Sequence, residues 1–174
     1  MGARGAIIMG FFGAVFATLT MRLQWQIGGA TLGLPFFVFL AIAAAAVRTM
    51  RLQGNGAVLT ERTKKALMWS STAEGIGIFL ASNIVNNLHR PDLLLPAMAL
   101  VVGLHFLPIA HAASSRPFYL LGGFLLISAV IGFAVAGPVG SSVAGIAAAG
   151  SLWFASTAAI SRDRRAKRAS LAYE

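Results

Sequence analysis

Residues 93–112 read LLLPAMALVVGLHFLPIAHA and contain no Asp, Glu, Lys or Arg. A transmembrane helix needs about 20 predominantly apolar residues to cross a hydrocarbon core that is about 30 Å thick. Because the bilayer offers no water to hydrogen-bond an exposed backbone, a segment that crosses it must be a helix or a strand of a closed barrel. The length and composition of this run therefore predict one membrane-spanning helix.

Five further apolar runs have similar length, and together the runs predict a bundle of six spans. The predicted spans are residues 6–21, 28–47, 66–88, 93–112, 117–136 and 139–160. The composition supports a membrane protein. Of the 174 residues, 57% are hydrophobic and 11% are charged, and the mean hydropathy is +0.78. This composition provides too little polar surface for a small water-soluble domain. We therefore predict an all-α polytopic membrane protein, with a six-helix transmembrane bundle at residues 1–161 and a basic cytoplasmic tail at residues 162–174.

The basic residues predict the orientation of this bundle. Of the 14 Lys and Arg residues, 12 lie before the first span, after the last span or in alternate gaps, namely Arg4, Arg48, Arg51, Arg62, Lys64, Lys65, Arg116, Arg162, Arg164, Arg165, Lys167 and Arg168. Arg22 and Arg90 lie in the other gaps. Short cytoplasmic loops carry an excess of Lys and Arg, so we expect both termini to be cytoplasmic and the protein to lie in the bacterial cell (inner) membrane.

The same charge pattern bears on the expected partners. The formal net charge is +9, but the basic residues border apolar spans, where they bind anionic lipid headgroups. We expect such contacts at Arg48–Lys65 and Arg162–Arg168, and no nucleic acid partner, because no nucleic-acid-binding motif accompanies the charge. Small residues in the last span predict close helix packing, either within the chain or between copies in a homo-oligomer; they are Gly140, Ser141, Ala144, Gly145, Ala148 and Ala149.

Glu74 is the only acidic residue inside a predicted span. An ionised carboxylate in hydrocarbon costs several kcal/mol, so Glu74 requires a proton, a partner or water. If spans 66–88 and 93–112 pack antiparallel about a turn near residue 90, Glu74 lies at the same depth as His105. The same register sets Ser70 and Ser71 level with His111. A carboxyl group beside an imidazole can share a proton and thus avoid a bare buried charge.

This polar layer has three interpretations. The first is a small transporter or channel for a proton, a cation or a small polar solute, with Glu74, His105, His111 and Asn83 as the candidate binding residues. The second is a membrane enzyme or metal-binding protein that uses Glu74, His105 and His111, although His105 and His111 lie on different faces of a regular helix. The third is a structural or accessory membrane subunit, in which the Glu74–His105 pair fixes the register of two helices.

Asn83, Asn86 and Asn87 form a second polar group near the outer end of their span. They either cap the helix and hydrogen-bond to neighbouring helices, or form the outer mouth of a polar path to Glu74. On an ideal helix Asn83 faces nearly opposite Glu74, which disfavours a straight path.

We expect no cofactor, and enzyme activity is the less favoured interpretation. The chain has no cysteine, no phosphate-binding loop and no G-x-G-x-x-G motif between a strand and a helix. A bis-histidine haem needs ligands on opposite sides of the macrocycle, whereas both intramembrane histidines belong to one span.

The stretch Gly103–Ala110, GLHFLPIA, with Trp69 and Glu74-Gly75 one span earlier, resembles a G-L-H-F-x-P-x-A pattern of small uncharacterised bacterial multi-pass membrane proteins. The resemblance implies a helical membrane protein and adds weight to Glu74 and His105. It implies no activity.

Overall fold

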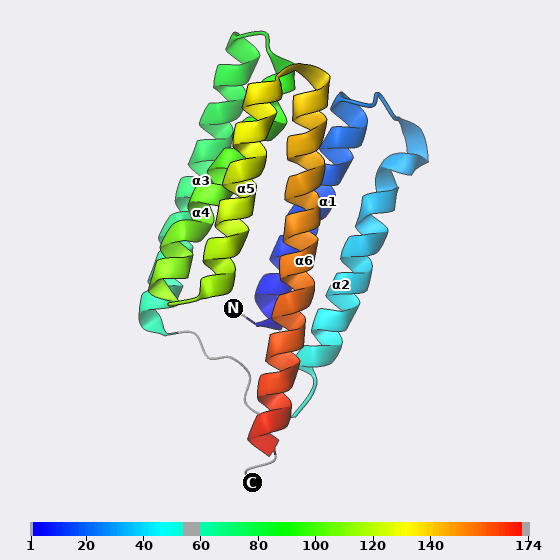
Figure 1. Ribbon diagram of the computed structural model, residues 1–174. Coiled ribbons are helices and arrows are strands. Elements are labelled where there is room, and N and C mark those ends of the chain that lie inside the picture. Colours follow the sequence, from blue (N-terminus) through cyan, green and yellow to red (C-terminus); the bar gives the residue numbers. More distant parts are fainter. Residues whose placement is uncertain (1, 54–59, 172–174) are drawn as a thin grey trace.

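The computed structural model describes residues 2–53 and 60–171, and these residues form six α-helices, two short 3₁₀-helices and no strand (Figure 1). The elements are α1 (Ala3–Leu23), η1 (Gly29–Gly33), α2 (Leu34–Met50), α3 (Glu61–Asn87), η2 (Pro91–Leu93), α4 (Leu94–Ala112), α5 (Arg116–Val135) and α6 (Gly137–Leu171). The prediction of an all-α chain is confirmed. Residues 54–59, inside the predicted headgroup segment Arg48–Lys65, and the last three residues of the predicted tail lie outside the described residues.

Within this part of the chain, five helical segments are long and apolar enough to cross a membrane, which makes the chain a multi-pass membrane protein. They are Ala3–Leu23, Gly29–Met50, Pro91–Ala112, Arg116–Val135 and Gly137–Leu171. The helix α3, which contains the predicted span 66–88, is absent from this set. Its sequence explains the difference, because Ser70, Ser71, Thr72, Glu74 and Asn83 interrupt its apolar residues.

The six α-helices form a row of antiparallel neighbours in the order α3, α4, α5, α6, α1, α2, and α6 also contacts α2 and α4. Figure 1 shows α6 between the α3–α4–α5 group and the α1–α2 hairpin. The beginning of α1 and the end of α6 lie at the same end of the bundle. We call this the terminal end of the bundle.

Close packing of α1 against α6 holds the centre of the row. The indole Nε1 of Trp153 in α6 donates to the backbone oxygen of Gly10 in α1 at 3.2 Å. A Cβ at Gly13 would lie 2.6 Å from the Trp153 ring and 3.2 Å from the Ala149 oxygen. The six small residues that the sequence singles out in α6 are all buried within the chain, so this face serves packing inside one copy.

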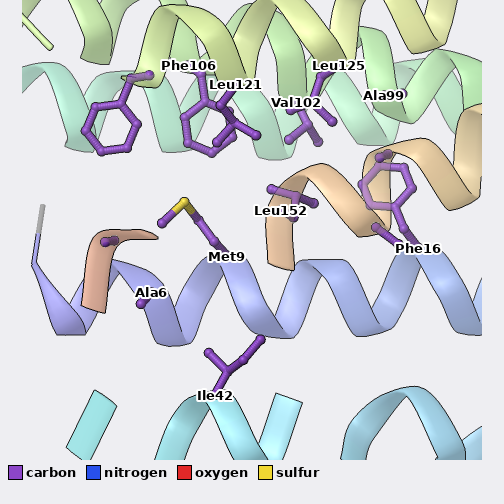
Figure 2. Close-up of a cluster of buried hydrophobic side chains, with 14 of the residues drawn as sticks. Ala6, Met9, Phe16, Ile42, Ala99, Val102, Phe106, Leu121, Leu125 and Leu152 are labelled. Carbon is purple, nitrogen blue, oxygen red and sulfur yellow. The ribbon is translucent and has the colours of Figure 1, made fainter. Parts of the chain in front are cut away.

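The largest hydrophobic cluster joins five of the six helices (Figure 2). Phe16, Val102, Leu125 and Leu152 belong to it and are almost fully buried. No residue of α3 belongs to the buried cluster, although Leu67 and Ile78 pack against it. The helix α3 is therefore attached to the outside of a bundle that the other five helices make.

Asp92 joins two turns at the other end of the bundle. Its carboxylate accepts from the Arg90 guanidinium at 2.9 and 2.8 Å and from the Gly137 backbone N–H at 3.1 Å. The hydrogen bond and the charge of Asp92 raise the pKa of Arg90. Gly137 has φ +62°, a conformation that glycine adopts without steric cost. A sharp turn therefore joins α5 to α6.

The basic segment after residue 161 continues α6 as far as Leu171, and two of its side chains are buried. The Asp163 carboxylate accepts from the Ala3 N–H, the first residue of α1, at 3.2 Å. The Lys167 ammonium donates to the Met50 and Leu52 oxygens, at the end of α2, at 3.0 and 2.9 Å. Negative charge is favourable at a helix N-terminus and positive charge at a C-terminus, so α6 holds both chain segments at the terminal end.

The α1–α6 contact leads to a stability prediction. Gly13→Ala forces a methyl group onto the Trp153 ring and should destabilise the fold by about 1–3 kcal/mol, the usual cost of overpacking. Gly123→Ala on α5 is the matched control, because a Cβ there meets nothing within 4 Å. Thermal denaturation in detergent should give a clearly lower melting temperature for Gly13→Ala alone. Equal melting temperatures would contradict the tight α1–α6 contact.

Candidate functional site

Two hydrogen bonds fix the register of α3 on α4. The Thr63 hydroxyl donates to the Ala112 oxygen at 3.2 Å, and the Ser70 hydroxyl donates to the His105 oxygen at 2.6 Å. The bonds lie seven residues apart on each helix, which is two turns. They therefore belong to one face of α3. Thr60 begins this helix by accepting from the Thr63 N–H at 3.2 Å.

Ser70, Glu74 and His105 form one polar cluster in the α3–α4 interface. The Ser70 hydroxyl lies 3.0 Å from Nδ1 of His105, and a carboxylate oxygen of Glu74 lies 3.4 Å from the same nitrogen. The side chains of Glu74 and His105 are 11% and 7% exposed. The predicted contact between Glu74 and His105 is thus present, but Ser70 is the residue of α3 that lies level with His105, and Glu74 lies one helical turn further along.

The hydrogen bonds indicate which nitrogen of His105 carries a proton. A serine hydroxyl has one proton, and Ser70 directs it to the His105 backbone oxygen. Ser70 therefore accepts from Nδ1, which makes Nδ1 the protonated nitrogen, and the Glu74 carboxyl group is a second, more distant neighbour of the same nitrogen. In the neutral imidazole the second nitrogen, Nε2, is then the proton acceptor.

Glu74 and His105 line a cleft of about 320 Å³ between α1 and the α3–α4 pair, which we call the α1–α3 cleft. The wall formed by α1 consists of Gly5, Ile8, Met9 and Phe12. Ile8 on this wall and Gly75 on the opposite wall are both exposed, so the cleft opens at the side of the bundle. It exists because α1 and α3 do not pack extensively on each other.

The structure does not bring the remaining predicted site residues into this cleft. His111 is exposed, and its Nδ1 lies 3.5 Å from the Tyr119 hydroxyl. Asn83 is exposed and donates to the Phe79 oxygen of its own helix at 2.7 Å. The prediction that Ser70 lies level with His111 is wrong, because Ser70 meets His105 instead, six residues or more than one and a half turns away on α4.

This placement removes the basis for a metal site made by Glu74, His105 and His111. Among the described residues, no group of three or more His, Cys, Asp or Glu side chains is arranged to hold a metal ion. Glu74 and His105 alone offer two ligands, whereas the common protein metal sites use three or more.

Two features of the site were not predicted from the sequence. One is the contact of Ser70 with His105, and the other is the cleft. Ser70 and Glu74 are four residues apart, so they share one face of a helix, and this spacing was the available signal. The cleft depends on the distance between α1 and α3, which no local pattern of the sequence encodes.

Comparison of the chain with protein-family models, curated protein sequences and solved structures finds no match. A function must therefore be argued from the cluster and the cleft.

The hydrogen bonds predict that Ser70, not Glu74, holds α3 on α4. Ser70→Ala leaves the His105 contact without its donor and should cost about 0.5–1.5 kcal/mol, whereas Glu74→Gln should leave the melting temperature nearly unchanged. Ser142→Ala is the control, because the Ser142 hydroxyl is exposed and bonds only to Pro138 of its own helix. Thermal denaturation of the three variants tests this. A larger loss for Glu74→Gln than for Ser70→Ala would make Glu74 the structural contact.

Proposed function

We propose that this protein is a small membrane transporter in which Glu74, with His105, binds and releases a transported proton. The observation that supports the proposal is the position of the Glu74 carboxyl group, which lines a cleft at the side of the bundle and lies 3.4 Å from an imidazole. Ionisable residues inside membrane spans mark ion and proton pathways more often than they mark packing.

The length of the Glu74–His105 contact argues against a purely structural role. Charge-assisted N–H···O bonds measure about 2.7–2.9 Å, so a contact of 3.4 Å is too long to be a strong clasp. Ser70 makes shorter contacts with the same histidine, at 2.6 and 3.0 Å. The structural role is therefore already filled, and the carboxyl group remains available to a ligand.

The proposal includes a topology with six spans and both termini in the cytoplasm of a bacterial cell. The helix α3 runs antiparallel to α4, which is a candidate span, and a turn at residues 88–90 joins them. Its polar residues Ser70 and Glu74 face α4 and the cleft, while Trp69 and Phe79 are 70% and 66% exposed. Large apolar side chains exposed in this way suit contact with lipid.

Labelling of single cysteines tests this topology, and the chain needs no prior change because it has no cysteine. In spheroplasts of an expressing bacterium, a membrane-impermeant maleimide should label Gln26→Cys and His89→Cys directly, because both positions lie between predicted spans. It should label Arg62→Cys and Ala166→Cys only after the membrane is permeabilised. All four positions are exposed. Labelling of Arg62→Cys and His89→Cys from the same side would show that α3 does not cross.

Proton flux into vesicles tests the transport function. We expect vesicles that contain the wild-type protein and an internal pH dye to acidify several-fold faster than protein-free vesicles when valinomycin and a potassium gradient impose an inside-negative potential. Glu74→Gln should reduce the rate to that of protein-free vesicles, because the amide cannot carry the proton.

Glu61→Gln is the matched control for this measurement. Glu61 lies on the same helix, is exposed, and pairs with Lys64 at 2.6 Å outside the cleft, so its loss should leave the flux at the wild-type rate. A Glu74→Gln protein that conducts like the wild type, or a wild-type rate equal to that of protein-free vesicles, would refute the proposed function.

A further inference from the structure

We propose that the α1–α3 cleft binds a hydrophobic organic cation, of the quaternary ammonium class, in exchange for the proton of Glu74. This inference rests on the proposed function, because it assigns a substrate class to the same carboxyl group.

The size and position of the cleft fit an organic molecule. Its volume of about 320 Å³ falls within the range of about 300–1,000 Å³ that is typical of small-molecule sites. It opens between Ile8 and Gly75 at the side of the bundle. A Cβ at Gly75 would meet nothing within 4 Å, so the absence of a side chain there widens the opening. A ligand that dissolves in the membrane can enter without crossing a polar mouth.

The charge of the cleft selects a cation. The lining comes from α1, α3, α4 and α6, and the titratable groups in it are Glu74 and His105. The residues that α1 and α6 contribute, including Met9, Phe12 and Leu152, carry no charge. A carboxylate in these surroundings is unfavourable unless a positive charge lies beside it. His105 supplies one in its protonated form, and a bound cation supplies one when His105 is neutral.

The apolar walls select an organic cation over a metal ion or a polar solute. A metal ion would exchange its hydration shell for protein ligands, yet the oxygen ligands on the lining side chains are those of Glu74 and Ser71. A sugar or amino acid would leave most of its polar groups without partners. A quaternary ammonium ion has no hydrogen to donate and needs only a counter-charge and apolar contact.

Aromatic rings in the walls add a specific attraction for this class. Phe12 lies on the α1 side of the cleft and Phe106 on the α4 side, next to His105. The face of an aromatic ring attracts an organic cation, and recognition of quaternary ammonium groups commonly uses this attraction.

The exchange keeps the site neutral at each stage. With no ligand, the Glu74 carboxyl group holds a proton. When the cation enters, the O–H bond of the carboxyl group breaks, the proton passes to water, and the carboxylate remains as the counter-ion of the bound cation. One cation therefore replaces one proton. Because the cation and the proton compete for the same carboxylate, the apparent affinity for the cation should fall tenfold for each unit by which the pH decreases, as long as Glu74 is protonated.

Calorimetric titration of the protein in lipid nanodiscs with benzyltrimethylammonium tests the proposal. We expect saturable binding that weakens as the pH falls, with release of up to one proton per protein in lightly buffered solution. Glu74→Gln should weaken binding at least tenfold and abolish proton release, whereas Glu61→Gln should bind as the wild type does. Neopentylbenzene, the neutral molecule of the same shape, should release no proton.

A second variant tests the cleft without altering the carboxyl group. Gly75→Leu places a side chain in the opening and should weaken binding at least tenfold, while its melting temperature shows that it is folded. Gly123→Leu, on α5 where the space is also open, is the control and should bind normally.

The outcomes separate this inference from the proposed function. Any of three results would overturn the inference. They are equal binding by the wild type and Glu74→Gln, binding that does not change with pH, and unchanged binding by Gly75→Leu. If the wild type binds no benzyltrimethylammonium at millimolar concentrations while proton flux still depends on Glu74, the organic cation is refuted and the proton transporter stands. If the cation binds as expected but the flux does not depend on Glu74, the transport function fails and the binding site stands.

Discussion

The hydroxyl of Ser70 is the contact on which the position of the candidate site depends. In a membrane, α3 cannot rely on water to satisfy its polar side chains, so each must find a partner on a neighbouring helix or on its own backbone. Ser70 donates to the backbone of His105 and accepts from the ring of the same residue. This double contact sets the register of α3, fixes the imidazole, and places Glu74 one helical turn further along, at the edge of the cleft. Glu74 can therefore line the cleft without carrying the helix contact itself.

The two walls of the α1–α3 cleft are built differently. The wall made by α1 belongs to the main hydrophobic cluster, and it is held by the Trp153 bond to Gly10 and by the close approach at Gly13. The wall that contains Glu74 is attached mainly through α4 and contributes nothing to the buried cluster. Apolar packing thus defines one side, and a few hydrogen bonds define the other. Elements that rearrange when ligands bind typically have few packing contacts. The helix α3 has few, and it carries Glu74, the only acid of the α3–α4 pair that faces the cleft.

The sequence predicts the helical class and the approximate ends of the helices, because both follow from local length and hydropathy. It also predicts that Glu74 lies near His105, and the contact is present, but Glu74 lies about one turn away from the equal depth on which that prediction was based. Length and hydropathy determine a span, and a tight turn brings residues of two antiparallel helices to similar depth.

The exact register of α3 on α4 and the cleft depend on the rotation and spacing of helices. Equal depth alone paired Ser70 with His111, whereas the observed register pairs it with His105. The cleft arises from the separation of α1 and α3, which are distant in the chain. The hydropathy pattern also assigned a span to 66–88, yet α3 falls short of the apolar character of the other five helices.

The charged residues beyond residue 161 show why charge patterns alone give an incomplete account. The sequence places Asp163 and Lys167 in a predicted basic cytoplasmic tail, yet both side chains are buried in the structure. They lie four residues apart, so they share one face of α6, and that face meets the start of α1 and the end of α2. A carboxylate near the unpaired N–H groups of one helix and an ammonium near the unpaired carbonyl groups of another satisfy backbone groups that have no partner within their own helices. Because the start of α1 also carries Gly5 and Ile8 of the cleft wall, this contact ties the position of that wall to α6. The same basic segment can thus orient the chain in the membrane and fix one side of the candidate site.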